Sequence, residues 1–182
     1  MEPPRSPSVC AIRAAEAADL PAIADIYNDA ALNSTATFDV EPWTPERRDQ
    51  WFHEHGHPYA VVVAARGPDV VGWAALSPFQ RKPAYRFAAE SSLYVQAERR
   101  GEGIGTLLLA RLLDVAAGNG CHSVLARIVG DNPASLRLHR RFGFRRAGIE
   151  REVGYKFDRW LDVIVVQKLL ADQPPKSATM RL

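Results

Sequence analysis

Residues 94–106 of the chain read YVQAERRGEGIGT, and this stretch decides the fold. It starts within the apolar run Leu93–Val95, passes through a polar turn with glycines at 101, 103 and 105, and leads into the amphipathic segment Ile104–Ala117. A strand, a glycine-rich loop and a helix N-terminus in this order favour a phosphate site. Glycines let the backbone approach closely, and the first N–H groups of a helix point toward an anion. The stretch therefore predicts a domain of strands and helices that binds a phosphorylated ligand.

The spacing of the glycines excludes two common phosphate-binding loops. The dinucleotide-binding pattern G-x-G-x-x-G needs a third glycine at position 106 or 108, where the chain has Thr106 and Leu108. The P-loop pattern G-x-x-x-x-G-K-[ST] needs a Gly-Lys pair, which the sequence does not contain. Residues 100–105 instead read RGEGIG, an R-x-x-G-x-G pattern. For this loop taken alone, an ordinary glycine-rich turn is the alternative interpretation.

The R-x-x-G-x-G loop resembles the pyrophosphate loop of the GCN5-related N-acetyltransferase (GNAT) superfamily, whose members bind acetyl-CoA. A second stretch, residues 132–144, reads NPASLRLHRRFGF and resembles the superfamily segment N-x-x-[AS]-x-x-[LF]-[YH]-x-x-x-G-F. The alternative for this stretch is a capped helix, with Asn132 at the N-cap, Pro133 in the first turn and Gly143 after the last turn. Both interpretations can hold, and two such segments in the expected order are more specific than either alone.

The resemblance implies acetyl-CoA as cosubstrate and implies no metal. It assigns the cofactor to the strand, the loop and the second segment, through Leu93, Tyr94, Val95, Arg100, Gly101, Glu102, Gly103, Ile104, Gly105, Thr106, Asn132 and Ser135. Arginine pairs stand at 99–100, 140–141 and 145–146, and of these residues we assign only Arg100 to the cofactor.

Three further blocks resemble one branch of the superfamily, the phosphinothricin and methionine sulfone N-acetyltransferases. Residues 83–95 (PAYRFAAESSLYV) resemble its R-x-A-Y-x-x-T-V-E-x-S-V-Y-V block, residues 153–163 (VGYKFDRWLDV) its V-G-x-K-F-G-R-W-L-D segment, and residues 33–38 (NSTATF) its N-x-x-A-T-F loop. The likeness spans nearly all of residues 12–169. The chain departs from the pattern where Ala88 and Ala89 replace Thr-Val, where Lys82 replaces a common arginine, and where Asp158 replaces a common glycine.

The resemblance implies a catalytic role for Glu90. An ammonium group has no lone pair and an α-amino group titrates near ~8, so a base must generate the neutral amine. We assign Glu90 as that general base, acting through a water; a carboxylate at a strand edge with no catalytic role is the alternative. For the acid that protonates departing CoA, the candidates are Tyr94, His139 or no protein group at all.

The substrate side is likewise implied by the resemblance. A guanidinium or ammonium group suits a carboxylate, phosphinate or sulfone head, although a basic surface loop is the alternative. The substrate residues implied are Thr35, Phe38, Arg81, Lys82, Tyr85, Arg86, Ser91 and Ser92. The expected reaction is acetyl transfer to the α-amine of a small amino acid or analogue of the phosphinothricin, methionine sulfone or sulfoximine type. The alternatives are a non-catalytic acyl-CoA-binding or sensor domain, and an acetyltransferase acting on a protein N-terminus or a polyamine.

Composition agrees with one domain of 182 residues, with 47% hydrophobic and 24% charged residues. The net charge of +2 is too small to indicate nucleic acid as a partner, and no apolar run reaches the ~18 residues of a membrane span. Cys10 and Cys121 are predicted to be free thiols of a cytoplasmic protein. We expect a flexible N-terminus at 1–8, the GNAT-like domain at 9–170 and a flexible tail at 171–182. The family pattern implies a homodimer, with the Trp160–Leu161 segment at its interface.

Three histidines, His53, His55 and His57, are two residues apart, so on a helix they do not converge on one metal ion. The predicted fold class is α/β (α+β), a mixed and mostly antiparallel sheet flanked by helices. Helices are expected from Asp19, as N-cap, to about Leu32, from Thr44 to Gly56, and over Ile104–Ala117 and Pro133–Phe142. Strands are expected over Val9–Ala14, Tyr59–Ala65, Val70–Leu76, Phe87–Val95, Ser123–Ile128 and Asp162–Leu169, with another beginning at Phe144–Ala147.

Overall fold

The computed structural model describes residues 10–170, which form a single seven-stranded sheet with helices on it. The strand order is β1-β2-β3-β4-β5-β7-β6, and every neighbouring pair is antiparallel except the parallel pair β4 and β5. The expected mixed, mostly antiparallel sheet is therefore confirmed. The segments expected to be flexible, 1–8 and 171–182, lie outside the described residues, as does Val9 at the start of the first expected strand.

The strands are β1 (Ala11–Ala14), β2 (Ala60–Arg66), β3 (Asp69–Pro78), β4 (Ala88–Val95), β5 (Ser123–Val129), β6 (Arg145–Lys156) and β7 (Arg159–Leu169). The helices are α1 (Leu20–Asn33), α2 (Pro45–His53), α3 (Ile104–Gly118) and α4 (Pro133–Arg141). A short 3-10 turn, Pro83–Tyr85, precedes β4.

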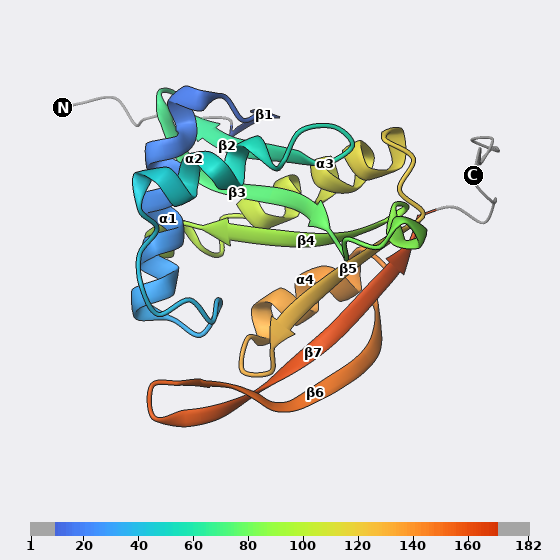
Figure 1. Cartoon of the computed structure of the whole chain (residues 1–182). Helices are drawn as coiled ribbons and strands as arrows, with labels where there is room; N and C mark the ends of the chain where they lie inside the picture. The colour runs from blue at the N-terminus through green and yellow to red at the C-terminus, as the bar shows by residue number, and fades with distance from the viewer. Residues whose placement is uncertain (1–9, 171–182) are drawn as a thin grey trace.

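Two apolar cores lie on opposite faces of the sheet. On one face α3 buries Leu108 and Leu112 against β2, β3 and β4, and on the other α1 buries Ile23 beside Trp73 of β3. Figure 1 shows that α1 and α2 cover the β1–β4 part of their face, while the long β6–β7 hairpin forms the end of the sheet beyond β5. On the α1 side, the second half of the sheet therefore remains open to a ligand.

The strands β4 and β5 run together only at their beginnings. Ala88, Ala89 and Glu90 pair with residues 123–125, and beyond Glu90 no partner residues continue the ladder. Since β4 continues to Val95 and β5 to Val129, the two strands part and leave a V-shaped opening in the sheet. Glu90 stands at the point where the opening begins.

Two details differ from the expectations. The second helix ends at His53 rather than Gly56, and His55 is buried beyond it, where its Nδ1 donates to the Trp51 carbonyl at 2.5 Å and its Nε2 accepts from the Ser77 hydroxyl at 2.8 Å. Asp19 occupies the N-cap position of α1 as expected, but its side chain accepts no hydrogen bond from the helix. Its carboxylate instead accepts two hydrogen bonds from Arg13, at 2.6 and 2.7 Å.

No helix within residues 10–170 combines the length and the apolar character that a membrane crossing requires. Cys10 and Cys121 are free thiols, as expected.

Candidate active site

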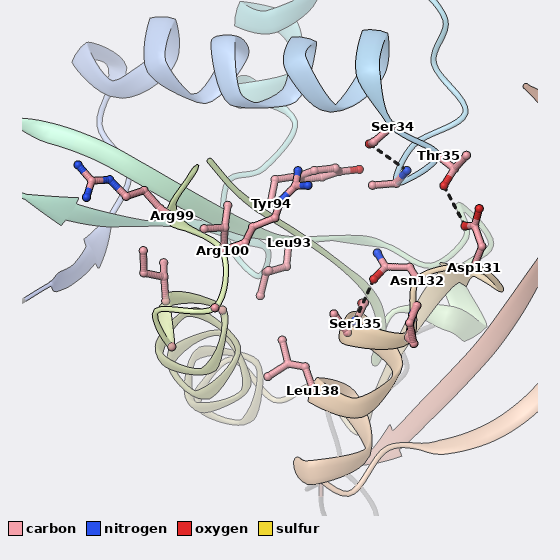
Figure 2. Close-up of a pocket in the computed structure, with 18 residues that line it drawn as sticks. Ser34, Thr35, Leu93, Tyr94, Arg99, Arg100, Asp131, Asn132, Ser135 and Leu138 are labelled. Carbon is pink, nitrogen blue, oxygen red and sulfur yellow. Dashed lines mark hydrogen bonds between the residues drawn. The ribbon is translucent and has the colours of Figure 1, made fainter. Parts of the chain in front are cut away.

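The V-shaped opening between β4 and β5 holds a cavity of about 420 Å³ (Figure 2). Four segments wall it: the loop after α1, the open edge of β4, the loop that begins α3, and the start of α4. The lining residues are Ser34, Thr35, Ala36, Leu93, Tyr94, Val95, Arg99, Arg100, Gly101, Gly103, Ile104, Gly105, Asp131, Asn132, Pro133, Ala134, Ser135 and Leu138. The structure thus brings together ten of the twelve residues assigned to the cofactor, from segments far apart in the chain.

The loop before α3 presents free backbone donors. Gly101 and Gly103 adopt φ of +83° and +84°, the left-handed region that glycine tolerates best. Within residues 10–170, the N–H groups of residues 101–105 have no hydrogen-bond acceptor, and the first helical bonds run from Thr106 and Leu107 back to the Gly103 carbonyl. Five free amides at a helix N-terminus suit the pyrophosphate of CoA.

Asn132 and Ser135 fulfil both interpretations of their segment. The Asn132 side chain accepts a hydrogen bond of 3.0 Å from the Ser135 N–H and so caps α4, while both residues line the cavity (Figure 2). On the opposite wall, β4 offers its unpaired edge at Leu93–Val95. An extended strand with free amide and carbonyl groups is a suitable partner for the amides of a pantetheine arm.

Glu102 and Thr106 do not line the cavity. Glu102 pairs with Arg66 at 2.5 Å and approaches Arg99 to 3.8 Å. Arg99 also lines the cavity beside Arg100, although the sequence assigns only Arg100 of the arginine pairs to the cofactor. The pairing of Glu102 accounts for the tolerance of a carboxylate in an anion-binding loop, because two guanidinium groups neutralise it.

The loop after α1 separates this cavity from a second one. Residues 34–36 line the first cavity, and residues 36–38 line a second of about 290 Å³ on the open sheet face. The rest of the second cavity is formed by Arg127, Val129, Glu150, Val153 and Val163. Ala36 belongs to both, so the two cavities adjoin at this residue. Thr35 and Phe38 thus lie in one loop on the two sides of the junction.

This dividing loop is fastened at two places. The Thr35 hydroxyl donates to Asp131 at 2.9 Å (Figure 2), and Asp131 also pairs with Arg159 of β7. The buried ammonium group of Lys156 donates to the carbonyls of Ala31, Thr37 and Asp39 at 2.6, 2.9 and 2.9 Å. The β6–β7 hairpin therefore holds the loop over the sheet.

Glu90 lines neither cavity, but it stands on the same face of the sheet as Arg127, which lines the second one. Its residue partner across the parallel ladder is Leu125, and residues alternate between the faces of a strand, so Glu90 and Arg127 stand on the same face. Burial raises the pKa of the Glu90 carboxyl, Arg127 opposes this shift, and Glu150 adds to it. A carboxyl group with a raised pKa is a stronger base once ionised, which suits proton removal from an ammonium group.

The two candidate acids lie in different surroundings. Tyr94 lines the first cavity, and burial raises the pKa of its hydroxyl, which therefore carries a proton at neutral pH. His139 lines neither of these two cavities; its Nδ1 donates to the Ser135 carbonyl at 2.9 Å and its ring packs edge-on against Phe144. Burial lowers the pKa of His139.

The residues expected around the substrate head are not gathered in either cavity. Arg81, Lys82, Tyr85 and Arg86 are exposed at the turn before β4, where the Arg86 guanidinium lies 4.4 Å from the centre of the Phe87 ring. They line neither the first nor the second cavity.

The two serines of β4 face opposite ways. The buried Ser91 hydroxyl donates to the Leu125 carbonyl at 3.1 Å, on the face away from Glu90, whereas Ser92 shares the Glu90 face. Sequence reasoning missed Arg127, Glu150 and Asp131. Arg127 was hidden because the strand around it was expected to be buried, and no local pattern marks an arginine that faces a cavity.

The histidine segment holds no metal geometry within the described residues. His55 is buried against Trp51, whereas His53 and His57 are exposed, and residues 10–170 contain no group of three or more His, Cys, Asp or Glu side chains placed to hold an ion.

A parted pair of parallel strands, a loop of free amides at a helix start, and a half-buried carboxyl where the strands part define an acyl-CoA-dependent acyltransferase. The model of the acetyltransferase (GNAT) family matches residues 20–144. The chain belongs to this family.

Three relatives give the comparison more detail. A phosphinothricin N-acetyltransferase of Streptomyces coelicolor is 44% identical over 149 residues, which cover 80% of this chain and 87% of that protein. An L-methionine sulfoximine/L-methionine sulfone acetyltransferase of Pseudomonas aeruginosa is 40% identical over 170 residues, with 92% and 97% covered. The crystal structure of a phosphinothricin acetyltransferase of Sinorhizobium meliloti in complex with AcCoA superposes with a TM-score of 0.88 at 35% identity, covering 94% of this chain and 96% of that one.

The chain is therefore an N-acetyltransferase that uses acetyl-CoA, and the alternative of a non-catalytic binding domain is set aside. The cavity between β4 and α4, with its free amides, is of a kind and position that fit this cosubstrate.

Proposed function

We propose that the enzyme acetylates the α-amine of a small amino acid or analogue of the methionine sulfone, methionine sulfoximine or phosphinothricin type. The observation that carries this proposal is the junction of the two cavities at Ala36, with Glu90 on the same sheet face as Arg127 of the second cavity. A cavity of about 290 Å³ suits an amino acid and is too small for a folded polypeptide segment. The names of the relatives from Streptomyces and Pseudomonas support the same substrate class.

In the proposed reaction the first cavity holds CoA and the second holds the amine. The amides of residues 101–105 bind the pyrophosphate, and the open edge of β4 aligns the pantetheine arm, which fixes the thioester near Ala36. Acetyl-CoA supplies the activated acyl group. Glu90, through a water, removes a proton from the ammonium group, so that the nitrogen lone pair can form the amide bond as the carbon–sulfur bond breaks.

Tyr94 is the better-placed of the two candidate acids. It lines the cofactor cavity and its hydroxyl carries a proton at neutral pH, but burial raises the pKa of that hydroxyl and so makes it a weaker acid toward the departing thiolate. His139 is turned into the core beside Phe144. A thiol titrates near ~8.5, so the thiolate leaves with little assistance and the contribution of Tyr94 is expected to be small.

The enzyme is proposed to work as a homodimer in the cytoplasm. The part of the β6–β7 hairpin around its turn, residues 153–160, carries four exposed large apolar side chains, and the rings of Tyr155 and Trp160 meet edge to face at 5.1 Å. The four are Val153, Tyr155, Phe157 and Trp160. Contiguous exposed apolar surface of this kind marks an interface. The free thiols of Cys10 and Cys121 are in keeping with a reducing compartment.

The proposal is tested by following thiol release from acetyl-CoA with methionine sulfone, methionine sulfoximine, phosphinothricin and the common amino acids. Turnover of at least one of them is expected, with the acetyl group on the α-nitrogen. Turnover of a polyamine or a peptide N-terminus alone would contradict the substrate class.

A further inference from the structure

The second cavity is lined mainly by apolar residues, with Thr37 and one pair of charged residues among them. Its walls are the 36–38 segment, two valines of the sheet and Val153, and the charged members are Arg127 of β5 and Glu150 of β6. A cationic and an anionic side chain that face one small cavity on the open side of a sheet indicate selection of a ligand by its charge.

Arg127 is placed next to the proposed chemistry. It lies two residues after Leu125, the partner of Glu90 in the parallel ladder, and points to the same side of the sheet. The opposing influence of Arg127 on the pKa of Glu90 agrees with this proximity. Arg127 is therefore close enough to the base Glu90 for both residues to act on the same small molecule.

Arg127 keeps hydrogen-bond donors free for a ligand, although it is paired with Glu150. Among the hydrogen bonds of residues 10–170, Arg127 donates once, from Nη2 to Glu150 Oε1, so its other donors are uncommitted. Both side chains are partly exposed, 46% for Arg127 and 33% for Glu150. An ion pair exposed to this degree contributes little to stability, and Glu150 can turn to water when a ligand takes its place.

We propose that Arg127 binds a carboxylate of the acceptor and so selects acceptors that are acids. The inference rests on the proposed function, since it places the acceptor in the second cavity. A guanidinium group suits this task because its planar fork can make two hydrogen bonds to one carboxylate. The same positive charge disfavours a polyamine, which has no group for Arg127 and adds a second cation to the site. Arg81, Lys82 and Arg86, which were expected to supply the cation, lie outside this cavity.

The carboxylate has two sources in an amino acid, and paired acceptors distinguish them. L-Methionine and L-methioninamide differ in the α-carboxylate alone, and L-glutamate and L-glutamine differ in the side-chain carboxylate. We compare kcat/KM within each pair for the wild-type enzyme, Arg127→Gln, and the control Arg146→Gln, which removes an exposed arginine of β6 outside the cavity. Any effect of Arg127 on Glu90 appears in both members of a pair and cancels from their ratio.

The wild-type enzyme and Arg146→Gln are expected to prefer the acid in at least one pair by tenfold or more. In Arg127→Gln the preference for the acid falls at least tenfold, a loss of about 1.4 kcal/mol. The loss comes from a higher KM for the acid, while KM for acetyl-CoA stays within twofold. Glu150→Gln, which frees Arg127, is expected to lower KM for the acid.

An Arg127→Gln enzyme that keeps its preference in both pairs, or loses activity equally on both members, overturns the inference and leaves the proposed function standing. If the wild-type enzyme acetylates no member of either pair, the proposed function fails, and the inference fails with it. Should Arg127→Gln not fold, Glu150→Gln decides: an unchanged KM for the acid contradicts the assignment.

Discussion

The ring of Phe38 lies directly against the α-carbon of Gly154. A Cβ built on Gly154 would stand 2.3 Å from Cε2 and 2.4 Å from Cζ of that ring, far inside van der Waals contact. Phe38 is a wall of the second cavity, and Gly154 belongs to the buried side of β6. The Phe38 ring can therefore occupy this position in the cavity wall only because Gly154 has no side chain.

A single methyl group at Gly154 is expected to reshape the acceptor site. Gly154→Ala must push the Phe38 ring away from β6 and so alter the second cavity, which raises KM for the amine at least threefold without changing KM for acetyl-CoA. The matched control is Gly148→Ala on the same strand, where a Cβ meets no atom within 4 Å. Steady-state kinetics with each substrate varied separately check this; equal KM values for the two variants would contradict it.

The dividing loop is expected to depend on Lys156. In Lys156→Met the chain length of the side chain is kept, but the carbonyls of Ala31, Thr37 and Asp39 lose their donor. Unsatisfied buried groups cost about 1–3 kcal/mol, so the free energy of unfolding measured in urea should fall by an amount in that range. The control is Lys168→Met, which replaces a half-buried lysine of β7, and its free energy of unfolding should fall less. A Lys156→Met protein as stable as the wild type would show that the loop is held by other contacts.

Glu90 is expected to set the acidic limb of the rate profile. Because burial raises the pKa of Glu90 above its ordinary 4.5 and a base acts only when ionised, kcat/KM should fall as the pH drops through that raised pKa. In Glu90→Gln, kcat should be lower by about 10²–10⁴-fold and this limb should be absent. Glu41→Gln, an exposed glutamate, should keep the wild-type profile. Near-wild-type turnover by Glu90→Gln would place the base elsewhere.

The loop before α3 is expected to bind CoA more weakly when residue 103 carries a branched side chain. At φ +84° valine is strained, and its side chain points where the backbone must meet pyrophosphate. Calorimetry should give at least a tenfold weaker affinity of Gly103→Val for CoA. Gly118→Val at the other end of α3, where φ is ordinary and the space is open, is the control. A folded Gly103→Val protein with wild-type affinity would remove the loop from the cofactor site.

The hairpin surface is expected to hold two copies of the chain together. Trp160 is 62% exposed, and Trp160→Glu places a charge in the middle of the proposed interface. Sedimentation velocity should show a dimer for the wild-type protein and a monomer for the variant. The control is Leu32→Glu, since Leu32 is also exposed but lies on α1. A wild-type protein that sediments as a monomer at micromolar concentration would exclude the dimer.

The fold and the cofactor cavity follow largely from local sequence signals. The conformation of the loop at 100–105 can be predicted from its sequence, because glycines at alternate positions permit left-handed φ values and a helix must begin directly after them. The helix after Asn132 is equally predictable, since a capping side chain followed by proline marks a first turn.

The acceptor side could not be predicted in the same way. The Nζ of Lys156 bonds to carbonyls more than a hundred residues earlier in the chain, and Arg127 meets Glu150 across separate strands. No local pattern encodes contacts of that range. The predicted end of α2 at Gly56 was wrong for a similar reason, because the hydrogen bonds of His55 to Trp51 and Ser77 depend on how this segment packs on the sheet.

One competition experiment tests the central claim, acetyl transfer to the α-amine of a small amino acid, most directly. Equal concentrations of methionine sulfone, spermidine and a short peptide compete for limiting acetyl-CoA, and mass spectrometry of the products reports the ratios of kcat/KM. The account predicts that N-acetyl methionine sulfone exceeds each other product by more than about tenfold, a difference of about 1.4 kcal/mol in the barrier. Acetylated peptide or polyamine in more than tenfold excess over the amino-acid product would contradict it.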